Sequence, residues 1–210
     1  MFKIKGKLQF VSVNTHYLAA LYNADNEVQY SSSGYENKKY LGVIVNQDDF
    51  RYVIPLTSAK EKHKSYKNIG DSYLLLYENA DYCEMRSNDI WMRYKDSKGN
   101  ETNNVKHILA LLDCRKMIPV IDGFYEGVDF TSSDDDSEDD AKYKDLLEKE
   151  YSFCVTNKEK ILKKANKIYD KRKNQGKRIP RCCDFKVLEQ VAISYTEMGN
   201  PHVIVKNSVK

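Results

Sequence analysis

The chain lacks any long hydrophobic run. No stretch of about 18 consecutive apolar residues occurs, so the sequence predicts no membrane-spanning helix. Its first ten residues, MFKIKGKLQF, lack the apolar segment that follows the charges of a signal peptide. We therefore expect a cytoplasmic protein without a membrane partner.

Metal-ligand and disulfide motifs are also scarce. The five cysteines show no C-x-x-C spacing and the four histidines are scattered, so we expect no metal site and no cofactor. Adjacent Cys182 and Cys183 are compatible with redox chemistry, but reduced cytosolic thiols are the commoner reading of such a pair.

Charge is present in blocks of one sign. The net charge of +3 hides twelve acidic and three basic residues in 122–150, and twelve basic and three acidic residues in 156–186. Such blocks are typical of a tail, a linker or a surface that binds a polyanion. The acidic run at 131–140, TSSDDDSEDD, predicts a solvated loop, because it lacks the glycine of a calcium-binding loop.

Hydrophobic periodicity predicts an α+β fold. Alternating or apolar runs predict six short strands, at 7–13, 40–45, 50–56, 72–77, 107–112 and 116–121. Helical spacing predicts helices at 15–22, 143–154, 161–169 and 185–195, and T-N-K-E from Thr156 predicts a capping box. A loop or an irregular helix is expected at 60–71, and a polar surface loop at 95–104. No crossover helix separates the predicted strands, so we expect an antiparallel, strongly twisted sheet in one domain over 1–195, followed by a tail over 196–210.

A cluster of polar side chains follows the predicted strand at 50–56. The segment PLTSAKEKHK brings together Thr57, Ser58, Lys60, Lys62 and His63. Three interpretations are open from the residues alone. The cluster is a polar turn whose hydroxyls satisfy the backbone, a phosphate-handling site, or a Ser58/Lys60 hydrolase of acyl groups.

Phosphodiester chemistry suits these residue types. Hydroxyls and lysines without carboxylates stabilise the extra negative charge of a pentavalent transition state. RNA carries its own nucleophile, the 2′-hydroxyl, so cleavage needs only charge stabilisation and proton transfer. The ordinary pKa of a histidine lies near neutral pH, so His63 is suited to that proton transfer.

Several longer stretches resemble one protein family. They are KKYLGVIV at 38–45, FRYVIPLTSAKEKH at 50–63, CRKMIPVI at 114–121, and a basic helix followed by FKVLE at 185–189. Together these stretches resemble the ToxN/AbiQ/CptN toxins, the endoribonucleases of type III toxin–antitoxin systems. The similarity extends over roughly Lys7 to Tyr195, and the long acidic loop favours the CptN branch.

The resemblance implies a compact, twisted antiparallel sheet flanked by helices, akin to the MazF and Kid toxins. It implies metal-independent cleavage of cellular or phage mRNA that leaves a 2′,3′-cyclic phosphate. It also implies inhibition by a small RNA pseudoknot, which the toxin cuts from a repeated precursor. Toxin and RNA would then form a closed assembly, either a ring or a heterotetramer.

Carried over by position, the resemblance implies catalytic functions for Thr57, Ser58 and Lys60. It implies RNA contacts for Lys38 and for a nearby tyrosine, which is Tyr35 or, failing that, Tyr30. His63 matches a histidine of some members. Our reading of the residues adds Lys62, and it adds four lysines of the basic segment 158–181 as antitoxin contacts: Lys163, Lys164, Lys167 and Lys171.

Two functions therefore compete. The first is an endoribonuclease toxin that serves phage defence by abortive infection. The second is a non-catalytic protein that binds structured RNA with the same basic surface and leaves the RNA intact. Substitution of Ser58 or Lys60 separates them, because a binding protein tolerates the loss of these groups.

Overall fold

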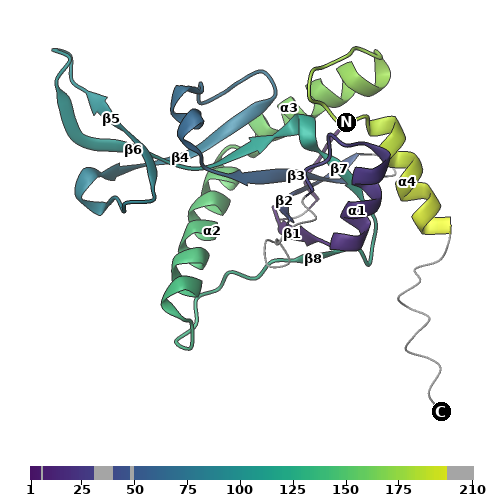
Figure 1. The fold of residues 1–210 in the computed structure, drawn as a ribbon, viewed down its shortest axis with the longest axis horizontal. Helices are drawn as coiled ribbons and strands as arrows, with labels where there is room; N and C mark the ends of the chain where they lie inside the picture. Colours follow the sequence, from purple (N-terminus) through teal and green to yellow (C-terminus); the bar gives the residue numbers. More distant parts are fainter. Residues whose placement is uncertain (6, 31–39, 48–49, 198–210) are drawn as a thin grey trace. The chain divides into compact units, whose positions relative to one another are not determined.

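The computed structural model describes residues 1–5, 7–30, 40–47 and 50–197. These residues form eight antiparallel strands and four α-helices, which confirms the α+β class and adds two strands to the six predicted (Figure 1). They group into two compact units. The first comprises Met1–Pro55, Cys114–Val128 and the residues from Ala165 onward, and the second comprises Leu56–Asp113 and Asp129–Lys164. The predicted single domain over 1–195 is not tested by this grouping, and its likeness to MazF and Kid stays a prediction.

The sheet of the first unit is built from five strand segments. They are β1 (Phe10–Val13), β2 (Tyr40–Gln47), the first part of β3 (Phe50–Ser58), β7 (Ile118–Val120) and β8 (Tyr125–Gly127). β1 pairs with both β2 and β8, and β3 pairs with both β2 and β7. Residues 42–45 and 52–55 of these two strands are buried in the core. This explains why the runs YLGVIV and FRYVIP are mostly apolar.

Two helices pack in the first unit, α1 (Thr15–Ala24) and α4 (Phe185–Glu197). The predicted helix start at Asn14 or Thr15 is an Asn14 cap, whose side chain accepts hydrogen bonds from the backbone of His16 and Tyr17 at 2.9 and 3.1 Å. α4 contacts α1 and β7. It buries the apolar positions predicted from its periodicity, including Phe185 and Leu188.

A buried polar network joins β3 to the C-terminal part of the same unit. Glu189 of α4 accepts hydrogen bonds from the hydroxyls of Tyr52 and Tyr169, at 2.5 and 2.8 Å. Lys173 lies 2.5 Å from the other carboxylate oxygen of Glu189. Each polar group thus has a partner away from water, which is the condition for burying it without a large loss of stability.

The second unit has a sheet centred on one long strand, β6 (Glu101–Asp113). β6 pairs with β4 (Tyr73–Asp81), with β5 (Ile90–Lys95) and with the last residues of β3, Leu56–Ser58. The helix α2 (Glu138–Thr156) lies against β4 and β6 (Figure 1). The interior of this unit is made largely by leucines and isoleucines of β4 and β6.

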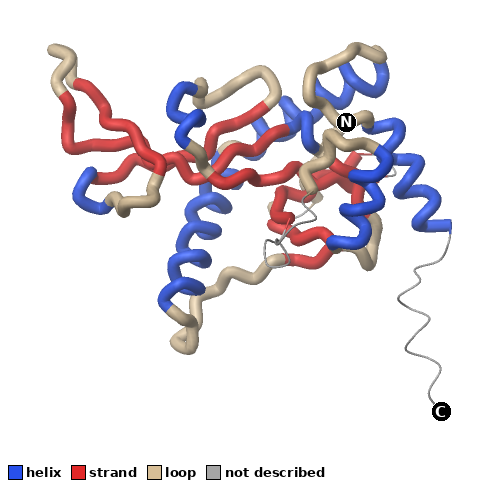
Figure 2. The backbone as a smooth tube through the Cα atoms, in the orientation of Figure 1, coloured by secondary structure: helices blue, strands red, loops and turns tan. Residues whose placement is uncertain are grey.

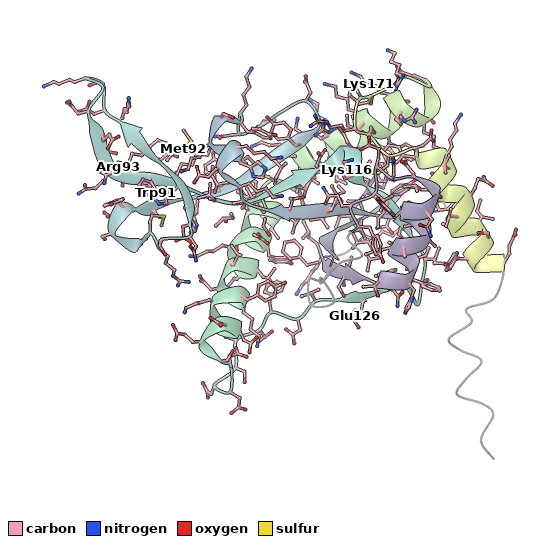
Figure 3. The ribbon with its side chains drawn as sticks, in the orientation of Figure 1. Trp91, Met92, Arg93, Lys116, Glu126 and Lys171 are labelled. Carbon is pink, nitrogen blue, oxygen red and sulfur yellow. The ribbon has the colours of Figure 1, made fainter. Side chains whose placement is uncertain are left out.

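The strands β5 and β6 form a hairpin where a polar loop was predicted. A tight turn closes it, with the Asp96 amide donating to the Asn100 carbonyl at 2.9 Å and Gly99 at a φ of 86°. β5 was missed because its sequence, IWMRYK, has no fully buried residue and shows neither an apolar run nor a regular alternation. Figure 3 shows Trp91, Met92 and Arg93 along this strand.

Part of the predicted acidic loop is helical, so that prediction was wrong at its C-terminal end. α2 begins at Glu138, inside the run TSSDDDSEDD. Ser137 caps it by accepting the Asp140 amide at 3.1 Å. Glu138, Asp139 and Asp140 occupy the first turn, where negative charge is favoured by the helix dipole.

The predicted capping box at Thr156 is also wrong. Thr156 is the last residue of α2, and its hydroxyl donates to the Ser152 carbonyl at 3.0 Å within that helix. Asn157 separates α2 from α3 (Lys158–Tyr169), so the helical run passes through the predicted start with one intervening residue. Figure 2 shows the helices of the chain in blue. α3 continues into a π-turn at Asp170–Asn174, and Gly176 follows with a φ of 63° at the predicted stop.

Candidate functional site

The strand β3 carries the predicted catalytic hydroxyls from the interior to the surface. Its residues are buried from Tyr52 to Pro55, whereas Thr57 is half-buried and Ser58 is exposed. Thr57 pairs with Leu111 and Ser58 pairs with Ala110 of β6. Because successive side chains of a strand alternate, the two hydroxyls lie on opposite faces of the sheet.

A short 3₁₀ turn, Glu61–Ser65, follows β3 and fixes the lysines of the cluster. The Lys60 amide donates to Nδ1 of His63 at 3.2 Å, and the His63 amide donates back to the Lys60 carbonyl at 2.7 Å. Lys60 and Lys62 are exposed. The turn therefore holds the Lys60 backbone two residues beyond Ser58 and leaves its ammonium group in solvent.

His63 itself lies inside this turn. Its side chain is buried, with the residue only 1% exposed, and its ring lies 5.1 Å from that of Tyr66. Burial, followed by the charges of Lys62 and Lys60, lowers the pKa of His63 below its ordinary value. A buried neutral ring whose Nδ1 already accepts a backbone hydrogen bond suits a residue that positions Lys60. This geometry does not favour the predicted proton transfer to RNA.

A cavity of about 410 Å³ lies beside Ser58 in the second unit. The end of β3, Glu78 of β4, the segment 84–90, His107 to Leu109 of β6, and five residues of α2 line it. Of the four predicted catalytic residues, Ser58 is the one that lines this cavity. The cavity thus places Ser58 at the edge of a concave space within the second unit.

Several charged side chains that line this cavity contact one another. Nδ1 of His107 lies 2.8 Å from Oε1 of Glu78, and the Lys149 ammonium lies 3.2 Å from the same oxygen. Oδ1 of Asp89 lies 3.8 Å from Nε2 of His107. The sequence indicated His107 only as the first residue of a predicted strand, and nothing in its local pattern marks Glu78 as its partner.

The basic segment is divided between exposed and tethered lysines. α3 buries Ile161, Ala165 and Ile168, while Lys163 and Lys167 are exposed. Lys171 lies on the π-turn that follows (Figure 3). Lys164 differs from its neighbours, because its ammonium donates to the backbone carbonyl of Gly70. The predicted RNA contacts of Lys163, Lys167 and Lys171 stay predictions, and Lys164 is held in part by the Gly70 carbonyl.

Of the predicted RNA-contacting residues before β2, only the alternative tyrosine, Tyr30, lies within the described residues. Tyr35 and Lys38 fall in the segment 31–39, outside the described ranges. Tyr30 is described, and its ring lies 5.4 Å from that of Tyr22. Their predicted contacts with RNA stay predictions.

Cysteine and metal chemistry find little support in the described ranges. All five cysteines are free thiols, and Cys182 and Cys183 are both buried. Burial raises the pKa of the Cys183 thiol well above its ordinary value, which keeps it protonated and unreactive. Within the described ranges, no group of three or more metal-ligating side chains is arranged around a common point. None of the helices described is both long enough and apolar enough to span a bilayer.

Comparison with known proteins gives one consistent match. Residues 9–193 match the family described as toxin ToxN of type III toxin–antitoxin systems. The chain is 24% identical over 200 residues to endoribonuclease ToxN of Bacillus thuringiensis subsp. kurstaki, with 92% of this chain and 87% of the relative covered. It is 27% identical over 198 residues to endoribonuclease AbiQ of Lactococcus lactis subsp. lactis, with 90% of each chain covered.

Two solved structures share the fold. The structure of AbiQ, described as a lactococcal anti-phage endoribonuclease of the type III toxin–antitoxin system, has a TM-score of 0.62 at 25% identity, covering 91% of this chain and 99% of that one. A second structure concerns selective toxin inhibition by a non-coding RNA pseudoknot. It has a TM-score of 0.62 at 22% identity, with the same coverage of 91% and 99%.

Proposed function

Because the chain belongs to the ToxN family of type III toxin–antitoxin toxins, it is an endoribonuclease toxin, and we propose that it cuts RNA without a metal ion at Ser58. The observation that carries this proposal is the position of Ser58. It stands exposed at the end of β3, lines a cavity with several charged side chains, and precedes the exposed Lys60 by two residues. Only Ala59 separates Ser58 from Lys60 in the sequence.

In this mechanism the 2′-hydroxyl of RNA attacks the adjacent phosphorus and the bond to the 5′-oxygen breaks, leaving a 2′,3′-cyclic phosphate. The Ser58 hydroxyl donates a hydrogen bond to a phosphoryl oxygen. Lys60 balances the negative charge that grows on the phosphoryl group in the transition state. His63 holds the Lys60 backbone through its Nδ1, and Thr57 lies on the other face of the strand.

The inhibitor in this proposal is an RNA pseudoknot, and the basic segment from α3 onward is the surface that binds it. Exposed Lys163 and Lys167 would neutralise phosphates, so the affinity should fall steeply with salt. We extend the same proposal to a closed assembly of toxin and RNA and to a function in phage defence. The mass of the complex in solution distinguishes a ring from a heterotetramer.

The test is an RNA cleavage assay in EDTA with the ends of the products identified. Wild-type protein is compared with Ser58→Ala and with a matched control, Ser65→Ala, whose exposed hydroxyl donates to the Lys62 carbonyl within the turn. We expect wild type and Ser65→Ala to leave cyclic phosphate ends and Ser58→Ala to be inactive while still folded.

Tight binding of structured RNA with no cleavage by wild-type protein would instead establish the rival function, a non-catalytic RNA-binding protein. Cleavage that stops in EDTA and returns with a divalent cation would contradict the metal-free mechanism.

A further inference from the structure

The cavity beside Ser58 contains a histidine that the predicted site did not include. We propose that His107 is the general base of RNA cleavage, with Nε2 taking the proton of the attacking 2′-hydroxyl and Glu78 holding the ring. This inference rests on the proposed endoribonuclease function and deepens it. Both residues line the same cavity as Ser58.

A bulge in β6 places His107 on the face of Ser58. Leu76 of β4 pairs with Ala110 of β6, but the next residue, Tyr77, pairs with Ile108, so Leu109 is the extra residue. Paired residues of an antiparallel sheet share a face, and Ser58 also pairs with Ala110. Without the bulge, His107 would point away from Ser58. With it, the imidazole and the hydroxyl both reach one cavity, which α2 also borders.

The contacts of His107 define its tautomer. Oε1 of Glu78 lies 2.8 Å from Nδ1, and a carboxylate only accepts hydrogen bonds, so Nδ1 carries the proton. The neutral ring then has its lone pair on Nε2. Asp89, at 3.8 Å, is beyond hydrogen-bonding distance of Nε2 but close enough to stabilise positive charge on the ring. Nε2 is therefore able to accept a proton, and two carboxylates stabilise the imidazolium that results.

Other charged groups of the cavity moderate this field. Lys149 of α2 lies 3.2 Å from Glu78 and also 3.2 Å from Asp145. The remaining charged side chains that line the cavity are Glu84, Arg86 and Lys142. The cavity lining thus holds four carboxylates and three cations beside His107, and two of the cations, Lys142 and Lys149, are themselves paired with carboxylates.

His107 is better placed for this chemistry than the other described histidines. The ring of His63 is buried and its Nδ1 accepts the Lys60 amide. His16 is exposed on α1, in the first unit. The side chain of His107 is 14% exposed, so it is largely shielded from water while still reaching the cavity.

The proposed step balances without a cofactor. The 2′-oxygen forms a bond to phosphorus, and its proton moves to Nε2 of His107. The bond between phosphorus and the 5′-oxygen breaks, and that oxygen takes a proton from solvent. The imidazolium returns its proton to solvent after the products leave.

The test follows cleavage of one mapped phosphodiester in a short single-stranded RNA under single-turnover conditions, as a function of pH. The variants are His107→Gln, whose amide can still donate to Glu78, and His107→Ala, with His16→Gln as the exposed control. We expect His107→Gln to lose roughly 10²–10⁴-fold in rate and to lose the acid limb of the pH–rate profile. Its affinity for the same RNA with a 2′-deoxy substitution at the cut should be unchanged. Added imidazole should restore part of the rate of His107→Ala.

The outcomes separate the two proposals. If wild-type protein cleaves, Ser58→Ala does not, and His107→Gln cleaves with the wild-type rate and pH profile, the endoribonuclease stands and His107 is not its base. If wild-type protein cleaves no RNA, both proposals fail. Should His107→Gln not fold, Glu78→Gln decides. Loss of the carboxylate that holds the ring should lower the cleavage rate without changing the affinity for the 2′-deoxy RNA, and an unchanged rate would overturn the assignment.

Discussion

The backbone amide of Lys60 donates a hydrogen bond to Nδ1 of His63, 3.2 Å away, inside the turn that follows the predicted catalytic serine. The bond requires an unprotonated Nδ1, because an imidazolium has donors on both nitrogens. The shape of the turn that presents Lys60 is therefore linked to the ionisation of a buried ring.

This link predicts an acid-sensitive fold. The pKa of His63 is lowered in the folded state, so the unfolded chain takes up a proton at a higher pH than the folded protein does. The stability contributed by neutral His63 is present above the ordinary histidine pKa and is lost as pH falls through the lowered one. We expect His63→Gln to flatten the loss of unfolding free energy between about pH 7 and pH 5, measured by urea denaturation. His16→Gln, at an exposed position, should keep the wild-type slope.

A buried carboxyl group on α2 predicts the opposite dependence on pH. Glu150 is 6% exposed, and burial raises its pKa from 4.5 to about 8. Above pH 4.5 the unfolded chain ionises while the folded protein keeps its proton, so folding loses stability as pH rises toward the raised value. Glu150→Gln should therefore raise the unfolding free energy at about pH 9 by up to about 4 kcal/mol relative to its effect near pH 5.

The control for this experiment is Glu148→Gln, two residues away on the exposed side of the same helix. It should change stability little, and equally at both pH values. Equal effects of the two variants would show that Glu150 is ionised in the folded protein.

Close packing at Gly42 predicts a strongly destabilising substitution. A Cβ added there would lie 2.4 Å from Cγ1 of Val53 and 2.5 Å from the Ile54 carbonyl oxygen. The backbone of β3 cannot move away without breaking its pairing with β2, so Gly42→Ala should cost at least about 2 kcal/mol. Gly127→Ala, on β8 with open space around the new methyl group, should change the unfolding free energy by less than about 0.5 kcal/mol. A Gly42→Ala protein as stable as wild type would mean that β2 and β3 are farther apart than described.

The lysines of α3 should separate RNA binding from folding. Replacing exposed Lys163 and Lys167 by glutamine should reduce the slope of log affinity against log salt by about 0.7–0.9 for each phosphate that the variant no longer neutralises. Stability should not change. Lys164→Gln should act in the reverse way, lowering the melting temperature because the Gly70 carbonyl loses its donor, with little effect on the slope. The slope is measured by fluorescence anisotropy with an uncleavable RNA. If the slope is the same for wild type, for the protein with Lys163 and Lys167 replaced, and for Lys164→Gln, then α3 is not part of the binding surface.

Sequence periodicity predicted the strands and helices whose apolar face is continuous. The runs at 40–45, 50–56 and 107–112 correspond to β2, β3 and β6, and FKVLEQVAISY corresponds to α4. β5 and β8 were missed because one is half exposed and the other spans only Tyr125–Gly127, too short for alternation to be read. Thr156 does not cap the next helix, because it is still part of α2 and its hydroxyl donates a hydrogen bond within the last turn of that helix.

Thr57, Ser58 and Lys60 could be predicted because they lie close together in the sequence, within a stretch that resembles one protein family. His107 could not, because it lies 49 positions from Ser58 and reaches it only through strand pairing and a one-residue bulge. His63 was selected by its proximity in sequence and by its match to a histidine of some family members. Its burial depends on packing against Tyr66, which a sequence pattern does not report.

The bond from Tyr52 to Glu189 joins positions 137 residues apart, so β3 acquires the acceptor for its buried hydroxyl only when translation has nearly reached the end of α4. A message cut anywhere before the codon for Glu189 encodes a chain whose first unit has an unfinished interior. Such a fragment exposes apolar surface and is a substrate for cellular proteases. For an enzyme that cleaves RNA, cuts within its own message therefore limit its supply, since they produce degradable fragments in place of shorter toxins.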